Sequence, residues 1–405
     1  MTPGAKIKTE LTRGAATSII DLVDSLIEEA HTLRASDLHI DPLEKEVKVR
    51  LRIDGVLQDA HSLPKDIHSQ IITRIKVLAR LRLDEHQAPQ DGRFRIILND
   101  IFIDIRVSIS PTYHGENAVM RILAERAENL TLESLGLRQE DRIKVEKASR
   151  NPYGMILATG PTGSGKTTTL YTILKKLHTK EVSIITIEDP VEYSIEGINQ
   201  MQVNPRAGLT FANGLRSMLR QDPDIIMVGE VRDSETAGLA VNTALTGHLV
   251  LSTLHTNDAA TTLARLIDLG LEPYLITATV NLVIGQRLVR KICDECKTKR
   301  KLSEAEEKNL REMKLLPKEL LSDHTVWHGK GCGNCVNSGY RGRIGIYEIM
   351  EITEAIREAM LLRKSSAEIK RLAQFAGMKT MVEDGFTKAF IGITTIEEVF
   401  RVIHE

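Results

Sequence analysis

This chain has few aromatic residues, few cysteines and almost no net charge. Its 54 basic and 55 acidic residues nearly cancel, so a strongly basic face for nucleic acid or anionic lipid is not expected. No apolar run is long enough to cross a bilayer, and the first residues, MTPGAKIKTELTRG, lack the pattern of a signal peptide. These features predict a cytosolic protein with no direct membrane span, which can still dock on a membrane through a partner.

Few aromatic residues (4%) beside 42% hydrophobic residues are typical of α/β proteins with parallel sheets. A length of 405 residues predicts two or three domains. The predicted parts are a mobile arm (1–15), a small α+β domain (16–123), a linker (124–138), an α/β core with a parallel sheet (139–290), a cysteine-bearing insertion (291–347) and a helical tail (348–405).

Local patterns within these parts predict individual elements. Ser18 is predicted to cap a helix that carries an apolar stripe to Leu33. Strands are predicted to stop after Gly285, and Thr395 with Glu398 forms a predicted capping box for the last helix. The predicted strands are 36–41, 47–53 and 94–109, with a helix at 67–83, and then 155–158, 183–187, 225–228 and 249–253.

The stretch GPTGSGKTTTL fits the phosphate-binding pattern G-x-x-x-x-G-K-[ST] between a predicted strand and a predicted helix. Glycines let backbone N–H groups wrap phosphates, Lys166 reaches the β- and γ-phosphates, and the Thr167 hydroxyl ligates Mg²⁺. The predicted nucleotide-binding residues are Gly160, Pro161, Thr162, Gly163, Ser164, Gly165, Lys166, Thr167 and Thr168.

Two acidic clusters follow at strand ends, where a parallel sheet places its ligands. They are IITIEDPVE, with Glu188, Asp189 and Glu192, and DPDIIMVGEVRD, with Asp224, Glu230 and Asp233. A single acid after a strand is usually just solvated. Two clusters downstream of a phosphate-binding loop instead favour binding of Mg²⁺ and polarisation of water.

His248 and His255 flank the apolar strand of TGHLVLSTLHTND. A histidine there either senses the γ-phosphate or is a satisfied core residue, and both interpretations stay open. Two CxxC pairs, Cys293/Cys296 and Cys332/Cys335, contain all four cysteines of the chain. In a reducing compartment this spacing predicts a closed, structural Cys₄ zinc site.

Taken together, these segments resemble the type II secretion and type IV pilus assembly ATPases (GspE/PilB type) of the secretion ATPase superfamily. The resemblance covers nearly the whole chain after the first residues. It rests on ASDLHIDP, PQDGR, GPTGSGKTT, TIEDPVE, RQDPDIIMVGEVRD, TGHLVLSTLHTN, GQRLVRKIC and GYRGRIGIYE.

The resemblance implies a PAS-like N-terminal domain, a RecA-like P-loop ATPase core and a homohexamer with ATP between these domains, at the border with the neighbouring subunit. It assigns Glu192 to the family's Asp box, as a catalytic and Mg²⁺-binding residue, and Glu230 to its Walker B motif. His248 and His255 fall in its His box. Glu188 and Asp189 lie beside Glu192 in the same nucleotide-binding segment.

Three arginines also take roles from the resemblance. Arg93 of PQDGR and Arg106 of DIRVS match N-terminal-domain arginines that reach the γ-phosphate, and Arg287 of GQRLVRKIC is assigned to nucleotide binding. An arginine supplied across a mobile interface would tie hydrolysis to domain motion. The alternative for Arg93 and Arg106 is ordinary exposed charge on a strand.

By analogy with the family, the motor works in the cytoplasm at the inner membrane, where it moves a platform protein and pseudopilin or pilin subunits are extruded. A cytoplasmic membrane-complex adaptor is a further implied partner, although many relatives bind it through an extra N-terminal domain. This chain begins close before ASDLHI, so recruitment by that route is not expected. Either the platform protein suffices, the system is reduced, or the chain is truncated.

Three alternatives remain. The pilus retraction ATPases and the type IV secretion ATPases generally lack the cysteine insertion, so its presence favours assembly. A zinc-ribbon nucleic-acid translocase is disfavoured by the balanced charge and few aromatic residues. Secretion and pilus assembly cannot be separated from this sequence.

Overall fold

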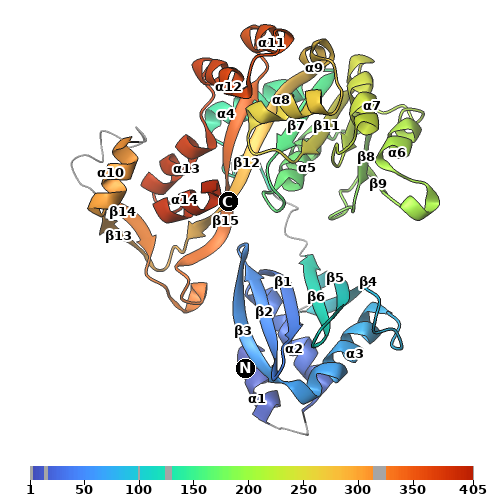
Figure 1. The fold of residues 1–405 in the computed structure, drawn as a ribbon, viewed down its shortest axis with the longest axis vertical. Helices are drawn as coiled ribbons and strands as arrows, with labels where there is room; N and C mark the ends of the chain where they lie inside the picture. The colour runs from blue at the N-terminus through green and yellow to red at the C-terminus, as the bar shows by residue number, and fades with distance from the viewer. Residues whose placement is uncertain (1–2, 13–16, 99–100, 124–129, 313–324, 405) are drawn as a thin grey trace. The chain divides into compact units, whose positions relative to one another are not determined.

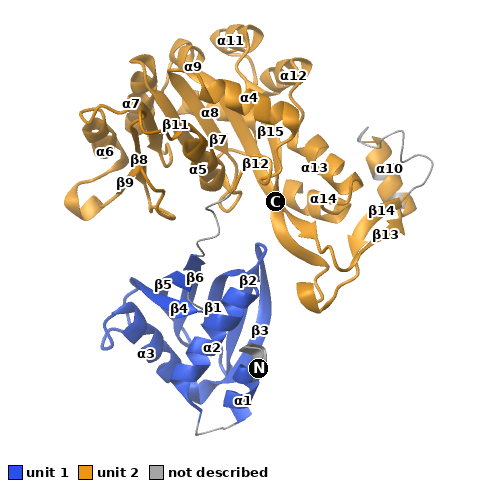
Figure 2. Ribbon diagram, turned by 180° about the vertical axis from the view of Figure 1, so that it is seen from behind, with its two compact units in different colours: residues 1–128 blue, residues 129–405 orange. Residues whose placement is uncertain are grey.

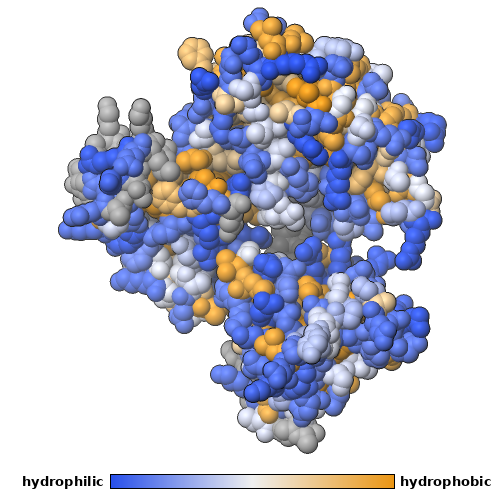
Figure 3. Space-filling view, viewed as in Figure 1, coloured by the Kyte–Doolittle hydropathy of each residue, from blue (hydrophilic) through white to orange (hydrophobic). Residues whose placement is uncertain are grey.

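The computed structural model describes residues 3–12, 17–98, 101–123, 130–312 and 325–404. The chain divides into two compact units, Met1–Glu128 and Asn129–Glu405 (Figure 1; Figure 2). No helix within the described ranges combines the length and hydropathy needed to cross a bilayer. On the face drawn in Figure 3 most surface residues are hydrophilic, and apolar ones are scattered among them.

Unit 1 is a six-stranded antiparallel sheet in the order β3-β2-β1-β6-β5-β4, with helices packed on one face. Its elements are α1 (Pro3–Thr12), α2 (Ile19–Thr32), β1 (Ala35–Pro42), β2 (Glu46–Ile53), β3 (Val56–Pro64), the 3₁₀ turn η2 (Lys65–Ile67), α3 (His68–Ala79), β4 (Gln90–Leu98), β5 (Ile101–Thr112) and β6 (Gly115–Leu123).

Side-chain alternation explains this one-sided core. Leu38 and Ile40 of β1 are fully buried in the cluster formed with the helices, and Asp37 and His39 lie on the opposite face. The strands predicted at 36–41, 47–53 and 94–109 are confirmed as β1, β2 and parts of β4 and β5. Ser18 caps α2 as predicted, because its Oγ accepts a hydrogen bond of 3.3 Å from the Asp21 N–H.

Two details of unit 1 differ from the predictions. Most of the arm predicted to be mobile forms α1, whose Ile7 is fully buried and whose Lys6 ammonium donates to Glu28 at 2.8 Å. Ile7 and Leu11 both pack against the core of unit 1, but two apolar positions in a polar segment are too weak a periodic signal to predict a helix. The helix predicted to reach Leu83 ends at Ala79, since Arg80 takes a left-handed φ of 56° that closes the last turn.

Unit 2 is built on a seven-stranded sheet in the order β15-β12-β7-β11-β10-β8-β9, in which only β15 runs antiparallel to its neighbour. The elements before the insertion are α4 (Gln139–Ser149), β7 (Gly154–Thr159), α5 (Lys166–Leu177), β8 (Ile184–Glu188), β9 (Asn199–Gln202), η3 (Pro205–Ala207), α6 (Phe211–Met218), β10 (Ile225–Val228), α7 (Ser234–Leu245), β11 (Leu249–Leu254), α8 (Ala259–Asp268), α9 (Pro273–Thr279) and β12 (Val280–Ile292).

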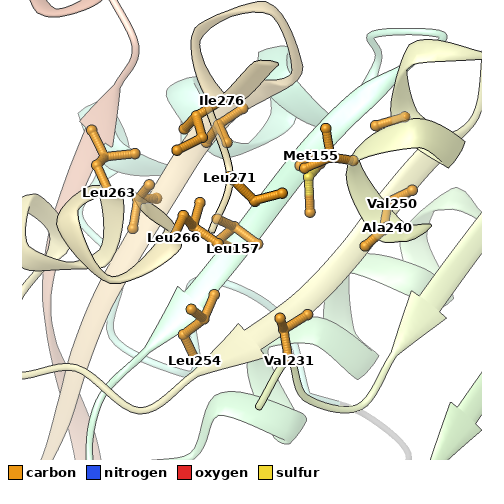
Figure 4. Close-up of a cluster of buried hydrophobic side chains, with 14 of the residues drawn as sticks. Met155, Leu157, Val231, Ala240, Val250, Leu254, Leu263, Leu266, Leu271 and Ile276 are labelled. Atoms are coloured by element: carbon orange, nitrogen blue, oxygen red, sulfur yellow. The ribbon is translucent and has the colours of Figure 1, made fainter. Parts of the chain in front are cut away.

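Helices cover both faces of this sheet, so its central strands are apolar on both sides. Met155 and Leu157 of β7 pack with α7, α8 and α9 (Figure 4). Ile156 and Ala158 point the other way, into a cluster with α4 and α5. The four predicted core strands are confirmed as β7, β8, β10 and β11.

The prediction that strands stop after Gly285 is wrong. β12 continues to Ile292, and β15 (Tyr340–Glu351) returns beside it in the same sheet. The insertion between them comprises β13 (Lys297–Lys301), α10 (Glu304–Glu312), β14 (Thr325–Gly329) and η5 (Gly333–Cys335). The prediction failed because charged residues in β12 and β15 interrupt the apolar pattern of a buried strand. Cross-strand pairing nevertheless stabilises both strands.

The tail after β15 is helical, as predicted, with α11 (Glu354–Leu361), α12 (Ser366–Phe375), α13 (Met381–Phe390) and α14 (Ile396–His404). Only half of the predicted capping box forms. The Glu398 N–H donates to Thr395 Oγ1 at 3.2 Å, but the Glu398 carboxylate accepts from the Arg290 N–H at 3.1 Å. In the predicted linker, residues 124–129 lie outside the described ranges, and Leu132 and Leu137 are buried in unit 2.

Candidate active site and metal centre

The loop at 160–165 joins the carboxyl end of β7 to the amino end of α5, as its motif predicts. Gly160, Gly163 and Gly165 have φ values of 146°, 78° and 88°, a region that residues with a Cβ rarely adopt. A Cβ at Gly160 would also lie 2.3 Å from the Gln286 carbonyl oxygen. The loop therefore needs glycine for its backbone, and its path leads into the first N–H groups of a helix, which suit a phosphate.

Lys166, the first residue of α5, is hydrogen-bonded to the loop that precedes it. Its Nζ donates to the Gly160 carbonyl at 2.8 Å and to the Pro161 carbonyl at 3.1 Å. Burial lowers the pKa of Lys166 to about 8, against the opposing effect of the Glu230 carboxylate. Among the described residues, the hydrogen bonds of this buried ammonium go to carbonyl oxygens, which it is well placed to exchange for phosphate oxygens.

Gln286 of β12 contacts the loop and was missed by the sequence predictions. It is fully buried, and its Nε2 donates to the Ser164 carbonyl at 2.8 Å. Its Oε1 and the Ser164 Oγ are buried atoms for which the described residues provide no hydrogen-bond partner. Such orphaned atoms beside a glycine loop fit a site that completes its hydrogen bonds with a polar ligand. The available signal was a glutamine inside the otherwise apolar run VNLVIGQRLV.

Glu230 and His255 lie with Lys166 at the carboxyl edge of the sheet. Glu230 follows β10 after one glycine, is buried, and pairs with Arg232 Nε at 2.5 Å and with His255 Nε2 at 3.4 Å. Burial lowers the pKa of His255, the Lys166 charge lowers it further, and Glu230 opposes both. Lys166 begins the helix after β7, Glu230 follows β10 and His255 follows β11, so these parallel strands bring three predicted site residues to one edge of the sheet.

Asp224 and Asp233, from the second acidic cluster, each bind a backbone group close by. Asp224 accepts from the Ser183 N–H at 2.7 Å at the amino edge of the sheet, and Asp233 caps α7 by accepting from the Thr236 N–H at 2.8 Å. Both carboxylates thus serve local backbone groups rather than the phosphate loop.

Glu188, the last residue of β8, is buried and accepts hydrogen bonds from the Tyr171 hydroxyl, from Thr186 Oγ1 at 2.6 Å and from Gln200 Nε2 at 3.2 Å. Burial raises the pKa of this carboxyl group despite those donors. Its bonds tie β8 to the phosphate-loop helix α5 and to β9, so Glu188 acts within the scaffold.

Glu192 and Asp189 lie in the loop after β8, where Glu192 is half-buried and Asp189 exposed. Gln200 braces this loop, since its Oε1 accepts from the Ile195 N–H at 2.7 Å and its Nε2 donates to the Tyr193 carbonyl at 3.2 Å. The loop follows the same sheet edge as the phosphate loop. Coordination of Mg²⁺ by Glu192 and Thr167 stays a prediction.

Two predicted site residues are not brought to the phosphate loop. His248 precedes β11 at the amino edge of the sheet, with its Nδ1 3.1 Å from the Thr243 carbonyl oxygen, whereas the loop follows the carboxyl end of β7. Arg287 lies on the face of β12 opposite Gln286. It donates to the Val402 carbonyl at 2.9 Å and lines a cavity of about 400 Å³.

Arg93 and Arg106 both belong to unit 1 and stand directly opposite each other on β4 and β5. Arg93 is exposed and Arg106 half-buried. The role predicted for these two arginines at the γ-phosphate stays a prediction.

The four cysteines form the one group of metal-ligand residues found among the described side chains, with all four Sγ atoms within 4.8 Å of one another. The Cys293–Cys332 and Cys296–Cys335 Sγ distances are 3.8 Å, and Cys332–Cys335 is 3.7 Å. A tetrahedron of thiolates with Zn–S bonds of about 2.3 Å has edges of about 3.8 Å. The cysteines therefore fit a Zn²⁺ ion, as their spacing predicts.

Backbone groups add to this fit. The Cys332 and Gly339 N–H groups donate to the Cys335 sulfur at 3.2 and 3.3 Å. Burial acts to raise the Cys335 pKa, but these hydrogen bonds and those with the Cys332 and Cys296 side chains outweigh it and lower the pKa to about 7. Burial raises the pKa of Cys296 to about 12, so metal binding there must displace a proton.

Comparison with known proteins agrees with this site. The family model for type II/IV secretion system proteins matches residues 13–401. Type II secretion system protein E of Xanthomonas campestris pv. campestris is 47% identical over 387 residues, which are 96% of this chain and 68% of that protein. The type IV pilus assembly ATPase PilB of Thermus thermophilus is 47% identical over 390 residues, which are 96% of this chain and 43% of that protein.

Among solved structures, the pilus retraction motor PilT with bound ADP superposes with a TM-score of 0.62 at 26% identity. The match covers 93% of this chain and 95% of PilT. With a family match over nearly its whole length and a phosphate-binding loop, acid and histidine assembled at one sheet edge, the chain belongs to the type II/IV secretion system protein family and is an ATPase of its secretion and pilus assembly branch.

Proposed function

We propose that the chain is a hexameric cytoplasmic motor that couples ATP hydrolysis to assembly of a pseudopilus for type II secretion or of a type IV pilus. The observation that carries this proposal is the cluster of Lys166, Glu230 and His255 beside the glycine loop. The names of the two relatives that are 47% identical support the assembly role.

In the proposed reaction, water attacks the γ-phosphate of ATP and yields ADP and phosphate. Lys166 and the loop N–H groups hold the phosphates, and the Glu230 carboxylate orients and polarises the water. The His255 Nε2 atom lies 3.4 Å from the Glu230 carboxylate, so the histidine can respond when that carboxylate binds water beside the γ-phosphate. Mg²⁺, with Thr167 and Glu192 as proposed ligands, would neutralise phosphate charge.

Arg93 and Arg106 are proposed to supply further positive charge to the γ-phosphate, and His248, Arg287, Glu188 and Asp189 are proposed to support nucleotide binding. For His248, Glu188 and Arg287 this support would be indirect, because their described bonds are to other groups. The proposed partners are an inner-membrane platform protein and a cytoplasmic membrane-complex adaptor, through which the motor associates with the inner membrane.

Pilus retraction is the second candidate function, favoured by the overlap with the PilT retraction motor. The cysteine insertion argues for assembly, because retraction members of the superfamily generally lack it.

The experiment compares Glu230→Gln with Asp233→Asn, a variant in the same motif whose amide oxygen can still cap α7. Glu230→Gln should bind ATP with near-normal affinity yet release phosphate about a hundredfold more slowly, because the charge that polarises water is gone. Asp233→Asn should keep the rate of the parent protein. An unchanged rate of phosphate release in Glu230→Gln would contradict the assignment of Glu230 to the active site.

A further inference from the structure

Gln200, on the edge strand β9, binds several parts of unit 2 at once. Its Nε2 atom lies 3.2 Å from three oxygen atoms, those of the Tyr171 hydroxyl, the Glu188 carboxylate and the Tyr193 carbonyl. Its Oε1 atom accepts a hydrogen bond of 2.7 Å from the Ile195 N–H. One amide group therefore joins the phosphate-loop helix α5, the end of β8 and two points of the loop after β8.

The strand register explains why this glutamine reaches the loop. β9 runs parallel to β8, and Gln200 pairs with Thr186, two residues before Glu188. The chain between Glu188 and β9 forms the loop, so its residues pass close to the Gln200 side chain. A primary amide has both donors and an acceptor, so it can serve a loop carbonyl and a loop N–H together.

The part of the loop held in this way begins directly after Glu192. Tyr193 is the next residue, and its ring packs edge to face against the ring of Tyr171, with centroids 4.7 Å apart. Burial raises the pKa of Tyr171, and a hydrogen bond from the Glu192 backbone acts in the opposite direction. The backbone around Glu192 is therefore held from α5 on one side and from β9 on the other.

Helix α5 also carries Thr167, the second residue proposed to bind Mg²⁺. Tyr171 follows Thr167 by four residues, so the two side chains lie on one face of the helix. The contacts of Tyr171 and Gln200 thus fix the loop of Glu192 relative to the helical turn of Thr167. A displacement of about 1 Å between groups that act together can lower a rate by about a hundredfold.

We propose that Gln200 is a positioning residue of the ATPase. Its amide, oriented by Tyr171 and Glu188, holds the loop so that Glu192 acts together with Thr167 on the nucleotide-bound metal ion. This inference rests on the proposed function, in which Glu192 and Thr167 bind Mg²⁺. It gives a role to a residue that the sequence motifs did not single out.

The first test measures phosphate release by Gln200→Met, made both in the parent and in Glu192→Gln. Gln202→Met is the matched control, because Gln202 lies on the same strand with its side chain exposed. Gln200→Met should lower the kcat of the parent about two- to tenfold and raise the Mg²⁺ concentration for half-maximal rate by a similar factor, as expected for lost buried hydrogen bonds. Gln202→Met should stay within about twofold of the parent.

The Glu192→Gln background separates positioning from a general effect on the fold. There, Gln200→Met should change the rate by less than about twofold, because the carboxylate that it positions is already gone. An equal factor of loss in both backgrounds would overturn the proposal, and so would an unchanged kcat in Gln200→Met beside a slow Glu192→Gln. If Glu192→Gln releases phosphate at the parent rate, the proposed role of Glu192 fails and the positioning role fails with it.

The second test needs no hydrolysis. Amide hydrogen exchange of residues 192–195 in the nucleotide-free chain should be faster in Gln200→Met than in the parent, and Gln202→Met should match the parent. Tyr171→Phe removes only one hydroxyl group and should change exchange and kcat in the same direction, so it replaces Gln200→Met if that variant does not fold. Equal exchange of this segment in all four proteins would contradict the proposal.

Discussion

Replacing one cysteine of the Cys₄ cluster should remove zinc and loosen the insertion while leaving ATP hydrolysis largely intact. The perturbation is Cys293→Ser, which removes one of four sulfurs that lie at the spacing of a zinc tetrahedron. The cluster is closed by four protein ligands, so a bound ion has no open position for chemistry.

The magnitude follows from how little else holds the insertion. Besides cysteines, the buried apolar residues described between 297 and 339 are Leu310 and Val326. At roughly 1.5–3 kcal/mol for each buried side chain, they contribute about 3–6 kcal/mol before conformational entropy is counted. Structural zinc contributes roughly 10–16 kcal/mol of apparent free energy in small domains. The metal, rather than the β13–β14 hairpin, should therefore keep this part folded.

The assay combines metal analysis, hydrogen exchange and phosphate release on the purified chain. The parent should contain one Zn²⁺, and Cys293→Ser should contain little and exchange rapidly in β13 and β14. Thr298→Val, a change in β13 that spares the cysteines, should keep its zinc. Basal ATP hydrolysis by Cys293→Ser should stay within about threefold of the parent, whereas secretion or piliation should fall further. A zinc-free parent under reducing conditions, or loss of nucleotide binding on zinc removal, would refute this reasoning.

Three further outcomes are expected. Mixing Lys166→Ala chains with Arg93→Ala chains should restore some activity if subunits share sites, and specific activity should rise with protein concentration; activity independent of both would mean a self-contained site. ATP binding near pH 9 should take up protons, because the pKa of Lys166 is lowered to about 8 by burial and phosphate should raise it; equal calorimetric heats in buffers of different ionisation enthalpy would contradict this. Gln286→Leu should weaken kcat/KM about two- to tenfold through loss of its bond to the Ser164 carbonyl, as expected for one buried hydrogen bond, and an unchanged kcat/KM would remove Gln286 from the site.

Local patterns were enough to predict the features whose residues lie close together in the chain. The phosphate loop and the two CxxC turns each need only a short spacing, and the apolar runs of the central strands are visible one by one. Glu230 could also be predicted, because the carboxyl end of a buried strand marks the ligand edge of a parallel sheet.

Features that depend on pairing between distant segments could not be predicted in this way. His248 and His255 flank one strand, and only the sheet direction shows that His255 alone reaches the loop edge. Gln286 requires knowing that β12 lies beside β7. The continuation of β12 and β15 was hidden because charged residues interrupt their apolar pattern.

Phosphate release from ATP by the parent chain and by Lys166→Ala tests the central claim most directly. Lys176→Ala is the matched control, because Lys176 lies on the same helix and pairs with Glu146 away from the loop. The parent and Lys176→Ala should release phosphate only when Mg²⁺ is present, and Lys166→Ala should be slower by about a hundredfold or more, since the γ-phosphate loses its main positive partner. Equal rates in all three proteins would contradict the assignment of this loop as the site of ATP hydrolysis.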